Sequence, residues 1–210
     1  MKIHLISDHH LESNYRYEGD VFPEPPKCDV IIVGGDLVPL EHGYDKAKAY
    51  FTYLKGFADH VIYILGNHEM FHSQWEYTIH LAKQLAKETK VHFLDVESDP
   101  RLVIDGVKFW GSTLWTDLNN NDYRTAESVT NGLDDYISIK KGDRALNTTD
   151  TFEQYQKTSM SIDWSSDVII SHHSPIYIKH RKFDYSATAH GFYCFDRTLE
   201  NKIVESSVKY

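Results

Sequence analysis

The sequence is poor in cysteine and has no long apolar run, and both absences limit what it can encode. Cys28 and Cys194 stand far apart with no Cys-x-x-Cys spacing, so neither a disulfide framework nor a thiolate metal site is indicated. No apolar run approaches the roughly 20 residues of a membrane span. A strand pattern starts at once at the N-terminus, where a signal peptide would otherwise stand. We therefore expect a soluble, reduced, cytoplasmic protein with no membrane partner.

Positive charge is also scarce. The chain has 22 basic and 31 acidic residues and a formal net charge of −9. Non-specific binding to duplex DNA is disfavoured, because it depends on Lys and Arg neutralising phosphates. A phosphoester small molecule or nucleotide remains compatible, since bound cations would reverse the local field. The 210 residues fit a single domain, 1–210, and nothing in them indicates an oligomeric state.

What the sequence does contain is a set of four short apolar strands that each end in polar residues. The predicted strands cover residues 2–7, 29–33, 61–65 and 167–171. In an α/β protein the carboxyl ends of parallel strands border the ligand crevice. We therefore expect the residues that follow these strands to meet at one site: Asp8, His9, His10, Asp36, Asn67, His68, Glu69, His172 and His173.

These residue types are those of a divalent metal site. Carboxylate, imidazole and amide oxygen together suit Mn, Fe, Zn or Mg. Asp8 and His10 are two residues apart, so they would project to the same side of an extended backbone. Any one of these short motifs is more often a turn or a structural histidine than a ligand. All four together, each at a strand end, favour a shared metal site.

The four segments resemble the calcineurin-like metallophosphoesterase superfamily. They read Asp8-His9-His10, Gly34-Gly35-Asp36, Gly66-Asn67-His68-Glu69 and Ile170-Ser171-His172-His173, and residues 111–117 further resemble a segment of the bacterial and phage branch. The resemblance implies an α/β fold, an αββα sandwich of two mixed β-sheets flanked by helices. It also implies a phosphoester hydrolase with two divalent metal ions.

The resemblance suggests a role for each ligand. Asp36, alone after two glycines, would bridge two ions of Mn, Fe, Zn or Mg. Asp8 and His10 would bind one ion, and Asn67 and His172 the other. A hydroxide between the ions would attack the phosphorus atom, because bound cations lower the pKa of water.

Five further residues are candidates around the metals. His68 would protonate the leaving oxygen, since an imidazole titrates near neutral pH, and Glu69 would orient it. His9 and His173 neighbour the ligands and would contact substrate. Arg181 lies in a basic loop that would bind a substrate phosphate, although a solvated loop is an equal alternative.

One departure from the family pattern concerns the C-terminus. The family closes its site with a Gly-His-x-His segment that this sequence lacks, and residues 208–210 read as the start of the strand that would carry it. We expect either a naturally shortened protein or a fragment, with His180 or His190 as weak candidates for a compensating ligand. The alternative function is a catalytically impaired relative that binds a nucleotide or a protein. A nuclease is a third possibility that the acidic composition disfavours.

The remaining patterns predict the elements around this site. Asp105-Gly106 between two apolar runs is a strong hairpin signal. Asp45 is a candidate N-cap, and Ser73 with Glu76 forms a candidate capping box. Residues 117–150 predict an irregular excursion with short helices. The predicted helices are 45–58, 73–89, 151–164 and 198–206, and the further strands are 91–94, 101–104 and 107–111.

Overall fold

The first half of the chain builds a four-stranded parallel sheet. The computed structural model describes residues 1–13, 22–177, 191 and 193–206. In it the strands lie in the order β1-β2-β3-β4, with every neighbouring pair parallel. A mixed sheet was expected here, but crossover connections keep all four strands in one direction. The bounds are β1 Ile3–Ile6, β2 Cys28–Val33, β3 Ala58–Tyr63 and β4 His92–Phe93.

The second sheet is mixed, as predicted. It consists of β5 (Arg101–Ile104), β6 (Val107–Ser112) and β9 (Val168–Ser171). β5 and β6 are antiparallel, whereas β6 and β9 are parallel. The predicted hairpin joins β5 to β6 through Asp105 and Gly106, whose φ angles of 49° and 81° are those of the turn type that matches strand twist.

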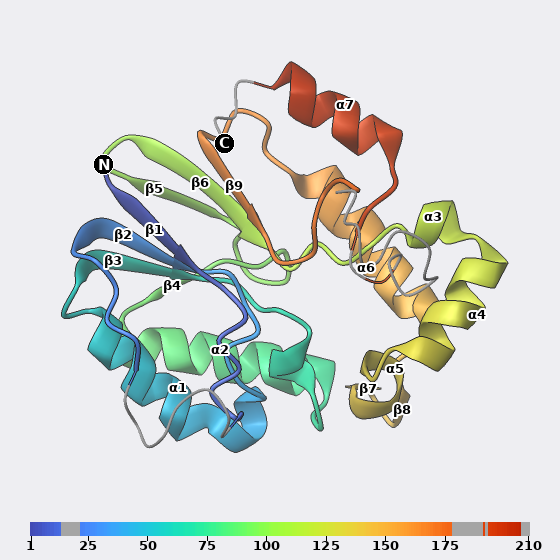
Figure 1. Ribbon diagram of the computed structural model, residues 1–210, viewed down its shortest axis with the longest axis horizontal. Coiled ribbons are helices and arrows are strands. Elements are labelled where there is room, and N and C mark those ends of the chain that lie inside the picture. The colour runs from blue at the N-terminus through green and yellow to red at the C-terminus, as the bar shows by residue number, and fades with distance from the viewer. Residues whose placement is uncertain (14–21, 178–190, 192, 207–210) are drawn as a thin grey trace.

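The two sheets pack face to face as an αββα sandwich, which confirms the predicted fold. Alternate residues of a strand point to opposite faces, so β2 and β3 are buried on both sides. Figure 1 shows α1 (Leu40–Leu54) and α2 (Trp75–Thr89) below the first sheet and α7 (Arg197–Glu205) above the second. The layer between the sheets contains Val30, Ile32, Ile62, Ile64, Leu94, Ile104, Phe109 and Ile170.

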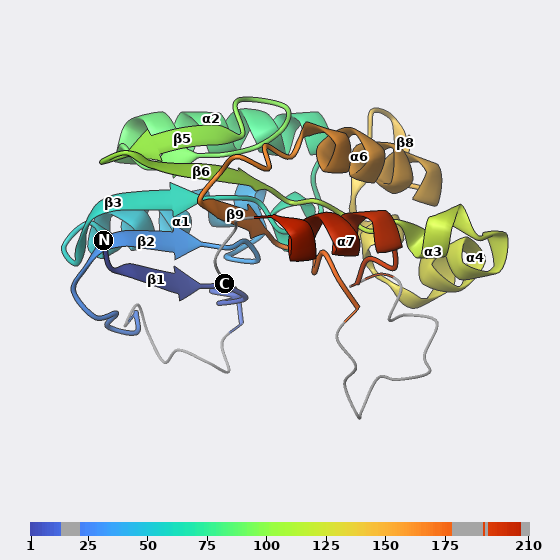
Figure 2. The same ribbon diagram turned by 90° about the horizontal axis from the view of Figure 1, so that it is seen from above.

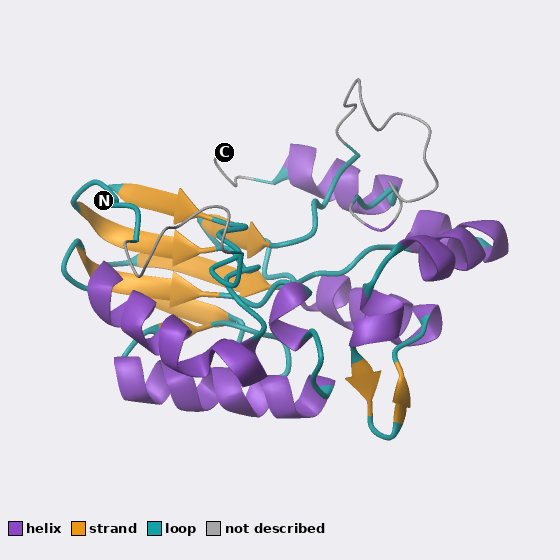
Figure 3. Cartoon of the chain, turned by 60° about the horizontal axis from the view of Figure 1, so that its bottom comes forward, coloured by secondary structure: helices purple, strands orange, loops and turns teal. Residues whose placement is uncertain are grey.

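A group of short elements lies beside the strand ends and not over a sheet face (Figure 3). The irregular excursion predicted for residues 117–150 is confirmed. Lys140 N donates to Ser73 O and His72 N donates to Ser138 O, which joins this group to the start of α2. The elements are α3 Leu118–Asn121, α4 Tyr123–Gly132, α5 Asp135–Ser138, β7 Lys140–Lys141, β8 Arg144–Ala145 and α6 Thr148–Ser161.

The N-cap residues predicted for α1 and α2 are wrong. α1 begins at Leu40 and not at Asp45, because it continues through a kink at Gly43, where φ is −110° and ψ is 16°. α2 begins after Gln74, and the capping box of Ser73 is not formed. The backbone at Ser73 instead accepts the hydrogen bond from Lys140, which keeps the chain extended through Gln74.

The direction of the strands positions the site. The arrows of β1, β2, β3, β6 and β9 point the same way in Figure 2, so the segments that follow β1, β2, β3 and β9 lie at one side of the molecule. Four residues separate the end of β3 from a short helix, η1 (His68–Met70). Within the described ranges, none of the helices has the length and apolar character needed to cross a bilayer.

Candidate metal centre

The loops after β1 and β2 run side by side and position the first candidate ligands. Asp8 N donates to Gly35 O at 3.1 Å, and His10 N donates to Asp36 O at 3.0 Å. The φ angles of Asp8, His10 and Asp36 are 56°, 45° and 53°, a left-handed region that costs energy for residues with a Cβ atom. The extended backbone expected for Asp8 and His10 is therefore wrong. Such strain is typical of functional sites held by their surroundings.

Asp36 lies between histidines from two different strand ends. Its Oδ1 is 3.4 Å from His172 Nε2, and its Oδ2 is 3.7 Å from His10 Nε2. The side chain is nearly buried, and Oδ1 also accepts from His68 N at 3.0 Å. A Cβ atom on Gly66 would lie 2.1 Å from Oδ1, so only glycine leaves space for the carboxylate. A carboxylate placed in this way can bridge two cations.

The second imidazole has a defined tautomer. His172 Nδ1 lies 2.9 Å from Gly34 O, and because a carbonyl can only accept, Nδ1 carries the hydrogen. In the neutral ring Nε2 then keeps a lone pair, and it lies 3.2 Å from Asn67 Oδ1, which also offers a lone pair, so that one cation could accept from both. This is how a metal-binding histidine is usually oriented by its outer hydrogen bond.

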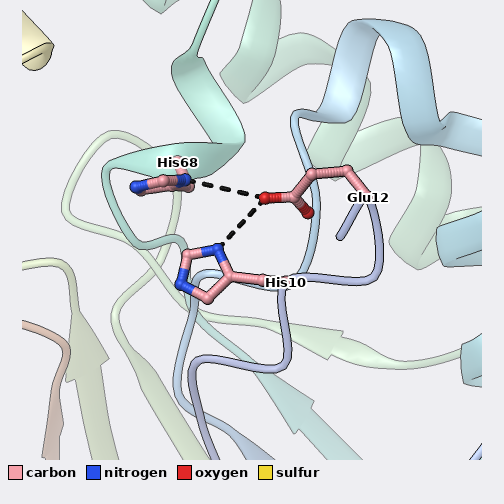
Figure 4. A group of neighbouring side chains, drawn as sticks. All are labelled: His10, Glu12 and His68. Atoms are coloured by element: carbon pink, nitrogen blue, oxygen red, sulfur yellow. Dashed lines mark hydrogen bonds and ion pairs between the residues drawn. The ribbon is translucent and has the colours of Figure 1, made fainter. Parts of the chain in front are cut away.

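The side chains form two groups with the spacing of metal ligands. Asp8, Asp36 and His172 each offer one ligand atom within 4.8 Å of the others, and His10, Glu12 and His68 do the same (Figure 4). The structure thus places Asp8 with His172, whereas the sequence suggested a pair with His10. Oxygen and imidazole donors around adjacent carboxylates fit divalent cations, because a cation compensates the repulsion between Asp8 and Asp36.

His68 lies in the second group. Its ring stacks on Phe71 with centroids 4.1 Å apart, and its Nδ1 is 3.7 Å from Glu12 Oε1. Burial lowers the pKa of His68, but the interaction with Glu12 and the charge of Asp36 outweigh burial and raise the pKa above its usual value. The shift favours the protonated form of the ring. Glu12 was missed from the sequence, although it repeats the two-residue spacing of Asp8 and His10.

Glu69 does not orient His68. Its carboxylate is fully buried and accepts from Gly66 N at 2.7 Å, Asp36 N at 3.0 Å and Leu37 N at 2.6 Å. Burial and the charge of Asp36 raise the pKa of Glu69 to about 7, despite these hydrogen bonds. Glu69 thus connects the loops after β2 and β3 and accepts a hydrogen bond from the backbone of Asp36.

Of the three residues predicted to contact substrate, two have other partners and one lies outside the described residues. His9 Nδ1 lies 2.8 Å from Tyr50 OH in α1, which directs the ring toward the helix layer. His173 is buried, and burial together with the charge of His172 lowers its pKa to about 3. It packs in the site wall and does not line the site. Arg181, with His180, His190 and residues 208–210, lies outside the described residues.

His173 belongs to a column of stacked rings. Trp115 stacks on His173 with centroids 5.1 Å apart, and Trp75 stacks on Trp115, also at 5.1 Å. Lys141 Nζ lies 4.5 Å above the Trp75 ring. At the inner end, His173 contacts His172 edge to face at 5.2 Å. The rings thus form a continuous series of contacts that ends at His172.

Comparison with known proteins gives a consistent result. An uncharacterised protein of Acanthamoeba polyphaga mimivirus is 23% identical over 222 residues, which cover 95% of this chain and 76% of that protein. The crystal structure of a phosphopantetheinyl hydrolase from Mycobacterium tuberculosis superimposes with a TM-score of 0.66 at 16% identity, over 92% of this chain and 76% of that one. An identity this low shows the fold alone. The family model of calcineurin-like phosphoesterases matches residues 1–202, and the chain therefore belongs to this family.

Proposed function

We propose that this protein hydrolyses phosphoesters with two divalent metal ions held by Asp8, His10, Asp36, Asn67 and His172. The observation that carries the proposal is the position of Asp36. Its two oxygens face His172 and His10 at 3.4 and 3.7 Å, as a bridging carboxylate requires. The donors are oxygen and imidazole nitrogen, which favours Mn, Fe, Zn or Mg over ions that prefer thiolates.

The chain supplies the groups that such a reaction needs. When bound, two divalent cations activate a water molecule and neutralise charge on the phosphate. Asp36 fixes the separation of the ligand sets, and Glu69 holds Asp36 in place through its backbone N–H. His68 is the proton donor to the leaving oxygen, because its imidazole lies beside the ligands and its pKa is raised.

We propose a small phosphoester, such as a nucleotide, as the substrate. Family membership supports the phosphoester, and the acidic composition disfavours a polynucleotide. We also propose a reducing compartment such as the cytoplasm, which is supported by the two free cysteines, Cys28 and Cys194. Activity toward a phosphomonoester and toward a phosphodiester would be compared directly, because the ligand set suits both.

The test uses protein stripped of metal and then reloaded with Mn. The probes are p-nitrophenyl phosphate and bis(p-nitrophenyl) phosphate. We expect metal-dependent release of p-nitrophenol from at least one of them, and its loss in Asp36→Ala. Asp59→Ala is the matched control, since Asp59 is exposed near the start of β3.

Two results would contradict the proposal. Unchanged hydrolysis in Asp36→Ala would remove Asp36 from the mechanism. The second result has two parts: the wild type binds Mn but hydrolyses neither probe, and Asp36→Ala abolishes Mn binding. This would indicate the alternative function, a binding module that retains the metals.

A further inference from the structure

The carboxylate of Glu12 lies between two imidazoles (Figure 4). Its Oε1 is 3.1 Å from His10 Nδ1 and 3.7 Å from His68 Nδ1. The two rings meet edge to face, with centroids 4.4 Å apart and an interplanar angle of 80°. Glu12 comes from the loop after β1, whereas His68 begins η1 after β3. One oxygen atom thus connects two strand ends.

The contact with His10 defines which ring nitrogen faces Asp36. An ionised carboxylate can only accept, so the His10 Nδ1 atom carries the hydrogen. His10 Nε2 then keeps its lone pair, and this atom lies 3.7 Å from Asp36 Oδ2. His10 in this way reproduces the arrangement of His172, whose Nδ1 faces Gly34 O. Each imidazole ligand therefore has an outer acceptor that directs Nε2 toward Asp36.

The contact between Glu12 and His68 restrains the His68 ring at its Nδ1 edge. Phe71 covers one face of the His68 ring at 4.1 Å and 20°, while Glu12 lies at the Nδ1 edge. Figure 4 shows the second ring nitrogen of His68 on the side away from Glu12. Nε2 is therefore the nitrogen available to a substrate.

We propose that Glu12 is a positioning residue for both histidines. It holds His10 with Nε2 toward the metal ligands, and it holds His68 with Nε2 toward the leaving oxygen. The part concerning His68 rests on the proposed hydrolysis, whereas the part concerning His10 requires only metal binding. The competing assignment is a separate metal site made of His10, Glu12 and His68, whose ligand atoms lie within 4.8 Å of one another.

The first experiment needs no turnover. Metal-free wild type, Glu12→Ala and Glu12→Gln are titrated with Mn, with Glu41→Gln as control because Glu41 is an exposed acid in α1. We expect Glu12→Ala to weaken Mn binding about 10- to 100-fold, the usual effect of removing an outer hydrogen bond from a ligand. Glu12→Gln should recover part of the affinity, because its carbonyl oxygen can still accept from His10. The number of Mn ions bound should not change.

The tautomer of His10 can be observed directly. In metal-free protein, ¹⁵N NMR should show His10 protonated at Nδ1 in the wild type and mainly at Nε2 in Glu12→Ala, with the resonance assigned through a His10→Gln variant. Loss of one Mn per chain in Glu12→Ala would make Glu12 a ligand and overturn the proposal. An unaltered His10 tautomer together with unaltered affinity would also overturn it.

The second experiment concerns His68 and compares two leaving groups. A p-nitrophenolate departs without a proton, whereas an alkoxide needs one. If Glu12 positions His68, Glu12→Ala should reduce kcat for an alkyl phosphoester by a larger factor than kcat for the p-nitrophenyl ester, both measured at saturating Mn. Equal reductions would contradict the His68 part. Absence of turnover in the wild type would contradict the proposed function instead, and the Mn and NMR results would still test the His10 part.

Discussion

Replacing Glu69 by alanine should destabilise the metal-free protein in a pH-dependent manner. The Glu69 carboxylate accepts from three backbone N–H groups, those of Gly66, Asp36 and Leu37, at 2.7, 3.0 and 2.6 Å. It is 0% exposed, so alanine would leave these donors without an acceptor in the protein interior. Each buried N–H that loses its partner costs about 1–3 kcal/mol. At about 2 kcal/mol for each donor, the loss is about 6 kcal/mol.

The charge of the carboxylate offsets part of this loss. Burial and the charge of Asp36 raise the pKa of Glu69 from 4.5 to about 7. At about 1.4 kcal/mol for each pH unit, ionised Glu69 contributes about 3 kcal/mol less than protonated Glu69. Because the folded pKa is the higher one, the stabilisation of about 3 kcal/mol is complete below pH 4.5 and is lost as pH rises through about 7. We therefore expect Glu69→Ala to cost about 6 kcal/mol near pH 4.5 and about 3 kcal/mol near pH 8.

Urea unfolding of the metal-free protein at the two pH values measures both costs. Glu127→Ala is the control, because Glu127 is exposed in α4 and should stay within about 0.5 kcal/mol of the wild type. Where the variant is too unstable to give a native baseline, Glu69→Gln, which keeps one acceptor oxygen, should show the same trend with pH. A free energy of unfolding within about 0.5 kcal/mol of the wild type at both pH values would refute the reasoning.

Three further outcomes are expected. Gly66→Ala places a Cβ atom 2.1 Å from Asp36 Oδ1. It should therefore weaken Mn binding at least about tenfold in a titration. Wild-type affinity would show that the loop around Gly66 can shift without moving Asp36. Burial raises the pKa of Asp95 from 3.8 to about 6, so its contribution to stability is lost as pH rises through 6. In urea unfolding, the free energy of unfolding of Asp95→Asn relative to that of the wild type should therefore rise by about 3 kcal/mol between pH 4 and pH 7. A difference that stays constant with pH would contradict this. Asn147 accepts from Asp150 N at the start of α6, and Asn147→Ala should cost about 1 kcal/mol in thermal unfolding; an unchanged Tm would count against the cap.

The positions of the site residues along the chain were predictable because they depend on topology. A buried strand is marked by its apolar run, and parallel strands bring their carboxyl ends to one edge. This rule predicts that three residues meet, and the structure brings them together: Asp36, Asn67 and His172. The start of α2 depended on a contact that is not local. The hydrogen bond between Ser73 and Lys140 joins residues distant in sequence, which no local pattern contains.

The orientation of side chains within the site was not predictable in the same way. Asp8 and His10 adopt left-handed backbone, and this overrides the alternation that applies to an extended chain. Glu69 reads as a partner of its neighbour His68, but its hydrogen bonds are to Gly66, Asp36 and Leu37. Two of these three donors come from the loop after a different strand, so the role of Glu69 depends on packing that sequence spacing does not encode.

The ring column beside His172 gives the protein a natural optical probe. Trp115 is separated from the ligand by a single imidazole, that of His173, and Trp75 continues the stack outward. A paramagnetic ion seated at His172 would shorten the excited-state lifetime of the nearer indole. Loading of the proposed metal site should therefore be detectable by intrinsic fluorescence, without label or substrate, and a Trp115→Phe variant would identify the part of the emission that reports it.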